Sequence, residues 1–517
     1  MSPLPARLGA ARPRAARLGA ARLGRAALAA TAVAVASALV LTGCSGSSDE
    51  NGGTDATVRV GLVLEPTSLD IRTQSGAALD QVLIDNVYQG LVGRTSDGDV
   101  RDVLASKHEV SSDGLTYTFT LRQGTTFQDG KDVTAADVVW SLQQVKSNES
   151  YVDSAQLANV TSITSPSSGV VELKLAKPDS DLLWNLTGRA GLVLEKAAKN
   201  DLSDTANGTG PYEVSSWKQG DSLTFKRNAD YWGTKAKVAK VVFRYITQPS
   251  TAVNAMANGD LDVQTAVDGT LKSQLQNSSD ITLHTGKTTD KYTLAFNDAK
   301  APFTDKKVRQ AIRQAIDSKA IIKAIGGTGV EQGGPIPELD PGYQDLTDID
   351  AYDPANAKKL LSEAGATNLK LTLTYANVYS ATIGDVLKSQ LADVGITLTV
   401  KRVDFATWLS QVFEKKDFDL SMVNHVESRD FGNWANPEYY FGYDNAEVQS
   451  LYADSVATTN EADKVADLQK AAKLVSEDAA GEWLYTATSI TAVRKGVTGF
   501  PYNGTNSRLD LSKLAVK

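Results

Sequence analysis

The residue types that most often carry catalysis are sparse and scattered in this chain. Its three histidines, His108, His284 and His425, lie far apart in sequence, and no H-x-x-x-H pair of the zinc-hydrolase kind occurs. No G-x-S-x-G motif is present, so a serine hydrolase with a nucleophile elbow is disfavoured. Asp260 and Asp262 have the spacing of calcium ligands, but the glycine and the distal glutamate of a calcium loop are missing. The sequence therefore predicts no catalytic centre, no metal site and no cofactor.

The single cysteine, Cys44, follows a segment with the layout of an export signal. Residues 1–43 contain six arginines and no acidic residue, and the stretch 26–42 is dominated by Ala, Val and Leu. A basic region followed by a short apolar run is typical of a signal peptide, so residues 1–43 are excluded from the fold. A permanent membrane helix is the alternative, but about 17 apolar residues lie at the lower limit for a span.

Residues 41–44, Leu-Thr-Gly-Cys, resemble the lipobox of bacterial lipoproteins. That resemblance implies that diacylglycerol alkylates the Cys44 thiol and that the chain is cut before it. A lone cysteine forms no internal disulfide, and no C-x-x-C pair exists. Two or more acyl chains hold a soluble domain at a membrane. We expect such a lipid anchor here, followed by a flexible tether at residues 44–57, which are rich in Ser, Gly and Asp.

The chain after the signal is long and acidic. It has 474 residues, enough for two or three domains with substantial cores, and contains no further apolar run long enough to span a bilayer. Since the six arginines of the signal belong to the 53 basic residues, residues 44–517 carry 47 basic and 61 acidic ones, a net charge of −14. Such a chain repels nucleic-acid phosphates, so a nucleic-acid partner is disfavoured. Neutral or cationic ligands are mildly favoured over anionic ones.

Local patterns in the N-terminal half predict both strands and helices. Alternating side chains predict strands at 58–63 and 116–121. Thr134 and Asp137 have the spacing of a capping box, which predicts that a helix begins there.

The C-terminal half shows a clearer α/β pattern. Asp353, followed by proline, predicts a helix start. A strand at 369–375, a helix at 383–394 and a strand at 396–400 form a strand–helix–strand unit, which argues for α/β layering. An earlier helix carries Arg309 and Arg313 on its polar side, where we expect them to be solvated or paired with acids.

Ordered short segments resemble the peptide/nickel-type solute-binding proteins (family 5) of ABC importers. The resemblance extends from Val58 to about Tyr502, and the order and spacing of the segments make it specific. The segments are 65–70 (EPTSLD), 86–91 (NVYQGL), 112–122 (SDGLTYTFTLR), 127–131 (FQDGK), 208–212 (GTGPY), 228–233 (NADYWG), 302–305 (PFTD) and 308–312 (VRQAI).

This resemblance implies an α/β fold with two lobes, of the periplasmic-binding-protein type II, and an extra domain inserted in lobe one. The expected boundaries are 58–290 for lobe one, with the inserted domain at roughly 92–205, then 291–480 for lobe two and 481–517 for the return to lobe one. The ligand would be enclosed between the lobes without catalysis, because closure excludes water and fixed groups choose the ligand.

The resemblance also implies partners and a location. The partners are a small, peptide-like solute, the permease subunits of an ABC importer and the membrane that receives the lipid anchor. We expect a monomer that is exported and held at the outer face of the cytoplasmic membrane, where it captures its solute and delivers it to the permease.

Peptide-binding members of the family pair an aspartate in a late lobe-two loop with the ligand's ammonium group, a charge-assisted contact. The corresponding loop here is 428–440. When it is anchored on Pro437, the aspartate position falls on Asn433, a neutral amide, and Asp430 lies three residues earlier. This departure favours a ligand other than a simple peptide held by its free N-terminus, unless a different loop length brings Asp430 into the site.

Other candidate ligand contacts are aromatic or acidic. Trp408, Trp434 and Trp483 could stack on a sugar or a planar group, with packing in the core as an equal alternative for each. Tyr485 and Glu65 are further candidates. A blocked peptide, a neutral oligosaccharide or a metal chelate therefore stands beside the peptide as a ligand.

Two other classes of function stay open. An extracellular sensor of the same fold would have the same sequence signature, and genes for permeases and ATPases beside this one would separate the two. An exported glycosidase or peptidase is disfavoured, because it needs a nucleophile or metal constellation that the sequence lacks.

Overall fold

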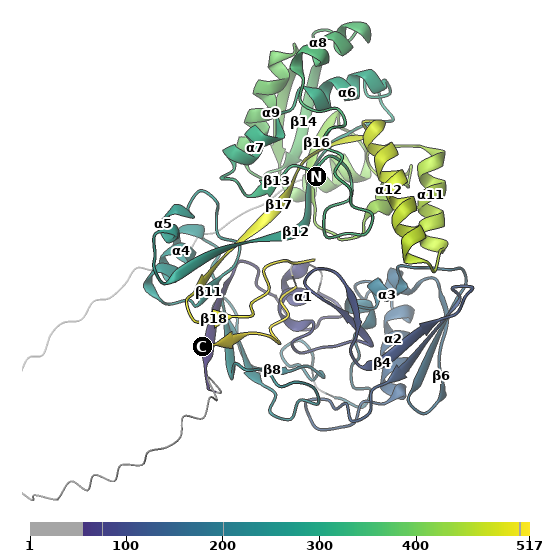
Figure 1. Cartoon of the computed structure of the whole chain (residues 1–517), viewed down its shortest axis with the longest axis vertical. Helices are drawn as coiled ribbons and strands as arrows, with labels where there is room; N and C mark the ends of the chain where they lie inside the picture. Colours follow the sequence, from purple (N-terminus) through teal and green to yellow (C-terminus); the bar gives the residue numbers. More distant parts are fainter. Residues whose placement is uncertain (1–54, 75, 200, 506–507) are drawn as a thin grey trace, which may run out of the picture. The chain divides into compact units, whose positions relative to one another are not determined.

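A mixed sheet of 11 strands organises the protein. The computed structural model describes residues 55–517 except 75, 200, 506 and 507, so Cys44 lies outside the described residues. The strand order is β15-β14-β16-β12-β17-β11-β1-β10-β9-β8, with β13 paired to β17. Two long strands, β12 (Ile281–Phe296) and β17 (Gly481–Arg494), are antiparallel partners and lie side by side in Figure 1. In the sheet, β12 and β17 stand between the strands formed by residues before β12 and the strands formed by residues between β12 and β17.

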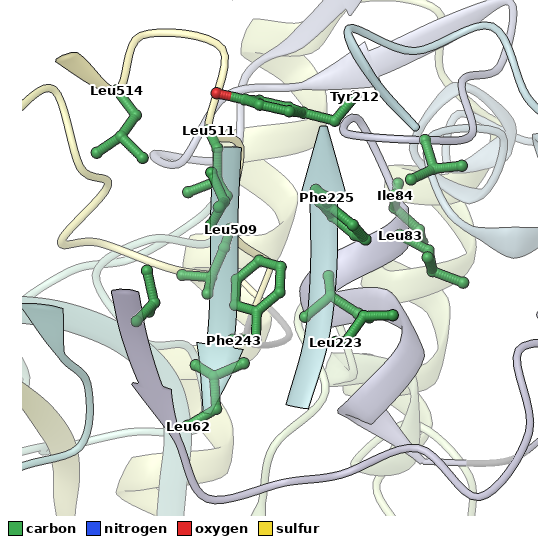
Figure 2. Close-up of a cluster of buried hydrophobic side chains, with 14 of the residues drawn as sticks. Leu62, Leu83, Ile84, Tyr212, Leu223, Phe225, Phe243, Leu509, Leu511 and Leu514 are labelled. Carbon is green, nitrogen blue, oxygen red and sulfur yellow. The ribbon is translucent and has the colours of Figure 1, made fainter. Parts of the chain in front are cut away.

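The first part of the sheet, which we call lobe one, comes mostly from residues before β12. Its strands are β1 (Thr57–Leu62), β8 (Tyr212–Lys218), β9 (Ser222–Arg227), β10 (Lys240–Tyr245) and β11 (Val263–Gln264). Its helices are α1 (Ala77–Leu83), α4 (Pro249–Asn258) and α5 (Ser273–Gln276), and a small hairpin pairs β18 (Val497–Thr498) with β19 (Ala515–Val516). Figure 2 shows part of its core, in which Phe225 and Phe243 of neighbouring strands pack with Leu509 and Leu511 from the end of the chain.

A second sheet lies between β1 and β8 in sequence, and we call residues 92–191 the inserted segment. Its elements are β2 (Val92–Arg94) and β3 (Val100–Asp102), the sheet β4-β5-β7-β6, and helices α2 (Ala135–Ser147) and α3 (Leu182–Asn185). The four strands of that sheet are β4 (Ala105–Val110), β5 (Thr116–Leu121), β6 (Val160–Ser167) and β7 (Val170–Leu175). Short 3-10 helices at Ser154–Leu157 and Arg189–Gly191 complete it. Its aliphatic and aromatic side chains form a core of their own.

The residues between β12 and β17, which we call lobe two, form the other part of the large sheet. Its strands are β13 (Gly329–Val330), β14 (Lys370–Ala376), β15 (Thr397–Val403) and β16 (Leu420–His425). Its helices are α6 (Lys306–Gln314), α7 (Ser318–Ala324), α8 (Pro354–Glu363), α9 (Ala381–Asp393), α10 (Phe405–Trp408), α11 (Ala446–Ala457) and α12 (Glu461–Glu477). A π-helical turn at Leu409–Glu414 and a 3-10 turn at Phe431–Asn433 follow α10 and β16. The two faces of this part of the sheet pack against two separate cores.

The structure confirms the local predictions. The Thr134 hydroxyl accepts a hydrogen bond from the Asp137 backbone N–H, and the Asp137 carboxylate accepts one from the Thr134 backbone N–H, so the capping box is complete. The Asp353 carboxylate caps α8 by accepting hydrogen bonds from the backbone N–H groups of Ala355 and Asn356. Strands β14 and β15 are parallel partners joined through α9, which is the predicted strand–helix–strand unit.

Two arginines of α6 differ from expectation, because both are buried. The Arg313 guanidinium is 3.0 Å from Glu482 and 3.5 Å from Asp350. Arg309 is 3.5 Å from Asp298 and also donates to three backbone carbonyls. Both arginines are therefore paired with acids, which was one of the two expectations, but the pairs lie inside the protein.

Among the described residues, no helix has both the length and the apolar character that a membrane crossing needs.

Candidate functional site

A groove of about 710 Å³ separates the inserted segment from lobe two. One wall consists of residues between 156 and 185, and the other consists of residues 427–429 together with residues 452–457 at the end of α11. Binding sites for small molecules typically measure roughly 300–1,000 Å³ and lie between domains. The groove therefore has the size and the position of a site for a small solute.

Direct contacts join the two walls at the edge of the groove. The ammonium of Lys464 in α12 is 2.6 Å from the Asp181 carboxylate of the inserted segment. Ser180 donates its backbone N–H to the Val456 carbonyl at 2.8 Å and its hydroxyl to the Ser455 carbonyl at 3.0 Å. Lys464 also donates to the Ser180 carbonyl at 3.5 Å, so within the described part of the chain the walls meet through one ion pair and three further hydrogen bonds.

Trp184 in α3 contacts arginines from both sides of the groove. The Arg94 guanidinium of β2 lies 4.3 Å from the centre of its ring, and the Arg429 guanidinium of lobe two lies 4.0 Å from it. Both distances are those of cation–π contacts. Trp184 and Arg429 line the groove, whereas Arg94 is buried beside them.

The loop that carries Arg429 is held by buried charges. Lys291 of β12 donates to the Glu427 carbonyl at 2.7 Å and forms an ion pair of 3.1 Å with Asp430. The Asp340 carboxylate accepts the Arg429 backbone N–H at 2.7 Å. Burial raises the pKa of both Asp340 and Asp430, and the Lys291 charge counteracts it. These contacts fix the backbone of residues 427–430, where Arg429 has a positive φ of 59°.

The Asp290 carboxylate lies close to three tyrosines of lobe two and its central strands, Tyr292, Tyr379 and Tyr485. Asn424, Tyr292 and Tyr485 are cross-strand neighbours on β16, β12 and β17, and the two tyrosine rings stack with centroids 4.5 Å apart. Tyr379 meets the Tyr292 ring edge-on at 5.7 Å. Asp290 precedes this row, and the Asn424 amide donates to it at 3.5 Å.

Asp290 forms no ion pair within the described part of the chain. Burial and the charge of Glu427, which lines the groove, raise its pKa, although the Asn424 hydrogen bond and Lys291 act in the opposite direction. A carboxylate beside aromatic rings attracts a cation. This cluster therefore suits an ammonium group.

The three candidate tryptophans lie in the core of lobe two. Trp434 stacks on Phe441 with centroids 4.2 Å apart and lies 5.2 Å from Trp483. The Trp408 indole N–H donates to Ser421 at 2.9 Å. All three belong to one hydrophobic cluster. Their contacts are those expected of side chains that pack in the core, which was the alternative to stacking on a ligand.

The other predicted residues occupy separate places. Asp430 is engaged by Lys291, and Asn433, three residues on, ends a short 3-10 helix and is half-buried. Tyr485 belongs to the tyrosine row described above. A Glu65 carboxylate oxygen accepts the Gly220 backbone N–H at 2.6 Å, within lobe one. The structure thus brings Tyr485 beside Asp290 but does not gather the predicted residues at one point.

Sequence reasoning missed the groove residues Trp184 and Arg429, the buried Arg94 beside them and the acid Asp290. Arg429 is next to Asp430 in the loop 428–440, so the sequence did show a second charged residue at this position. Arg94 and Trp184 had no local signal, since their roles arise from contacts between distant segments. Among the described residues, no group of three or more His, Cys, Asp or Glu side chains is arranged to hold a metal ion.

Comparisons with known proteins agree with this architecture. Residues 99–448 match the family model described as bacterial extracellular solute-binding proteins, family 5 Middle. The glutathione-binding protein GsiB of Salmonella typhi is 28% identical over 449 residues, which cover 82% of this chain and 87% of that protein. The probable D,D-dipeptide-binding periplasmic protein DdpA of Escherichia coli K12 is 27% identical over 447 residues, covering 80% of this chain and 86% of DdpA.

The fold is likewise shared with solved structures. The oligopeptide-binding protein AppA of Bacillus subtilis, solved in complex with a nonapeptide, superposes with a TM-score of 0.72 at 21% identity, covering 90% of this chain and 99% of AppA. The fold is the predicted two-lobed α/β fold of periplasmic binding proteins of type II. The match of the family model to more than half of the residues shows that this chain belongs to the bacterial extracellular solute-binding proteins of family 5.

Proposed function

We propose that the protein captures a peptide-like solute outside the cell and delivers it to the permease of an ABC importer. The groove between the inserted segment and lobe two carries this proposal, because its walls come from parts of the chain that closure would bring together. Relatives named for glutathione and D,D-dipeptide binding, and a structural neighbour that holds a nonapeptide, support a peptide-like ligand.

The ammonium group of such a ligand would bind to Asp290 rather than to Asn433 or Asp430. Asn433 offers only a neutral amide, and the Asp430 charge is already balanced by Lys291 at 3.1 Å. Asp290 has no ion-pair partner among the described residues, and it lies close enough to three tyrosines for its charge to act on them. A buried ammonium needs a counter-charge to replace its lost hydration.

The location we propose is the outer face of the cytoplasmic membrane. The basic and apolar leader and the Leu-Thr-Gly-Cys sequence at residues 41–44 support export and a lipid anchor on Cys44. A soluble binding domain on a short tether stays close to a membrane permease, which favours delivery of the captured solute. We expect the protein to act as a monomer and without catalysis.

Native mass spectrometry of the intact protein with pooled tripeptides tests the binding function. We expect one peptide to bind per protein, without chemical change to the peptide. At a hundred times the dissociation constant, the bound peptide should stabilise the protein by about 2.7 kcal/mol, and small-angle scattering should show a smaller radius of gyration. Turnover of the peptides, or no bound peptide in any pool, would overturn the proposal.

A further inference from the structure

Four exposed lysines lie at one edge of the lobe-one sheet, where β1 and β10 begin and β9 ends. They are Lys226 of β9, Lys240 of β10, and Lys235 and Lys237 in the segment that leads into β10. We call these four residues the basic edge. Lys240 is the cross-strand neighbour of both Lys226 and Thr57, so the basic edge extends from β9 to the first residue of β1.

The core of lobe one fixes the segment that carries two of these lysines. Ala236 and Val238 are buried in that core, with 2% and 0% of their surface exposed. Lys235 and Lys237 alternate with them and therefore point away from the core. The Arg227 guanidinium holds the same backbone, since it donates to the carbonyls of Ala236 and Lys237 at 3.3 and 3.4 Å.

Only part of the positive charge of the basic edge is balanced within the protein. The Lys226 ammonium is 2.7 Å from the Glu213 carboxylate of β8. The side chains of Lys235, Lys237 and Lys240 form neither an ion pair nor a hydrogen bond with any described residue. Lys226 and Lys240 also stand directly opposite each other, and like charges in that position oppose the pairing of their strands. An anionic surface outside the chain would relieve this repulsion.

The charge of the basic edge contrasts with that of the whole protein. Residues 44–517 carry a net charge of −14. Asp55 before β1 and Asp230 after β9 are exposed acids of the neighbouring segments, and neither forms an ion pair with the four lysines. Since the chain as a whole repels an anionic surface, such a surface is attracted where ammonium groups gather locally.

The chain enters lobe one beside these lysines. The Ala56 carbonyl accepts the backbone N–H groups of Ala239 at 3.0 Å and of Lys240 at 3.1 Å. Ten residues separate Cys44 from Asp55, and a chain of that length reaches at most about 40 Å. A lipid on Cys44 would therefore keep the lysines at a high effective concentration near the membrane, where weak contacts suffice.

We propose that the basic edge binds the anionic phospholipid surface of the membrane in which the protein is anchored. This assignment rests on the proposed lipid anchor at Cys44 and goes beyond the capture of a solute. The acyl chains hold the protein at the membrane, and the lysines turn one edge of lobe one toward the lipid head groups. A lipid chain and a polybasic patch are two signals that together give stable attachment.

The experiment uses the lipid-anchored protein, taken from the membrane fraction and reconstituted on two kinds of vesicle. One is pure phosphatidylcholine, which is neutral, and the other is an equal mixture of phosphatidylcholine and phosphatidylglycerol, which is anionic. Flotation measures anchoring, and acetylation followed by mass spectrometry measures the labelling rate of each lysine. We expect the four lysines of the basic edge to label at least about 3-fold more slowly on the anionic vesicles. Molar salt should remove the difference, because it screens the attraction.

A triple variant places this protection on the named side chains. It combines Lys235→Gln, Lys237→Gln and Lys240→Gln, all at exposed positions without an ion pair in the described part of the chain. Lys226 is left in place as the reporter. In this variant it should label at nearly the same rate on both kinds of vesicle.

The matched control changes the net charge equally in lobe two. It combines Lys323→Gln, Lys358→Gln and Lys388→Gln, at exposed positions of α7, α8 and α9. Lys226 should keep its protection on anionic vesicles in this control. In the unaltered protein, the three lobe-two lysines should label at the same rate on both kinds of vesicle.

The outcomes separate this assignment from the proposed anchor. Flotation with both kinds of vesicle, but equal labelling of the basic edge on them, would overturn the lipid contact and leave the anchor intact. Protection that the triple variant retains, or that the lobe-two control loses as well, would also overturn it. A protein that does not float with neutral vesicles would refute the anchor and this assignment together, while solute capture would stand on its own test.

Discussion

The ammonium of Lys291 lies 3.1 Å from a carboxylate oxygen of Asp430, and the two side chains expose only 3% and 12% of their surface. Lys291 comes from β12, which pairs with β17 along the centre of the sheet, whereas Asp430 belongs to the loop after β16. The ion pair therefore ties the groove loop to the central strands. The role of Asp430 in this structure is therefore to supply the counter-charge of the buried Lys291.

Asp430→Asn should destabilise the protein, because it leaves the Lys291 ammonium buried without its counter-charge. Breaking one partner of a buried ion pair costs roughly 3–5 kcal/mol, and urea unfolding measures the change. Asn433→Asp on the same loop is the control, since its half-exposed side chain should change stability by less than about 0.5 kcal/mol. An unchanged unfolding midpoint in Asp430→Asn together with lost peptide binding would instead assign Asp430 to the ligand.

Acidification should destabilise the protein through His425. Burial, followed by the Lys291 charge, lowers the pKa of His425 to about 4, from an unfolded value of 6.5. The folded state thus holds the neutral imidazole, so this contribution to stability is present above pH 6.5 and is lost as the pH falls toward 4. The difference corresponds to about 3 kcal/mol.

The measurement compares wild type with His425→Gln in urea at pH 7 and pH 4.5. The comparison is needed because Asp340 and Asp430 have raised pKa values and gain stability on acidification in both proteins. We expect the wild type to lose more stability than the variant over this range. Equal losses in the two proteins would exclude His425 as the cause.

Asp290→Asn should weaken binding of a peptide with a free amino group. The change removes the unpaired carboxylate that faces the tyrosine row and should reduce affinity by roughly 2–5 kcal/mol. N-acetylation of the peptide should produce a similar loss in wild type but little further loss in the variant. Calorimetry with both peptides checks this coupling, and additive losses would show that the amino group binds elsewhere. Asp260→Asn is the control, because Asp260 is an exposed acid that follows α4 in lobe one.

Lys464→Met should loosen the contact between lobe two and the inserted segment. The Lys464 ammonium is 2.6 Å from Asp181, and 4% of its side chain is exposed. Without this pair, the open state gains population, and the unliganded protein should show a larger radius of gyration by small-angle scattering. Lys470→Met on the same helix removes only an exposed contact with Asp467 and should leave the radius unchanged. Identical radii in wild type and both variants would count against a latch at this position.

Cys44→Ser should release the protein from the membrane fraction or leave it unprocessed. Cys44 is the only cysteine in the chain, so no other thiol can accept diacylglycerol. Fractionation and the mass of the N-terminal peptide measure the result, with the unaltered protein as the reference. Normal cleavage and membrane retention of the variant would refute lipid anchoring at this residue.

Much of the local structure could be predicted from the sequence alone. The capping box at Thr134 and Asp137, the cap at Asp353 and the parallel pair β14–β15 all formed as predicted. Helix caps and the alternation of apolar side chains involve residues a few positions apart, so the information that specifies them is local. The ordered family motifs added the fold class, which the comparisons confirm.

The tertiary structure decided which side chains meet. Arg313 lies on the polar side of a helix in sequence, yet it is buried because Glu482, which is 169 positions away, faces it. The Trp184 ring at the groove likewise contacts Arg94 and Arg429, which come from two distant segments. Such contacts depend on how the whole chain packs, so no spacing or periodicity in the sequence indicates them. The sequence by itself determined several helices and strands and the family, because caps, periodicity and ordered motifs are local, whereas the packing of distant segments determined which charges meet at the groove.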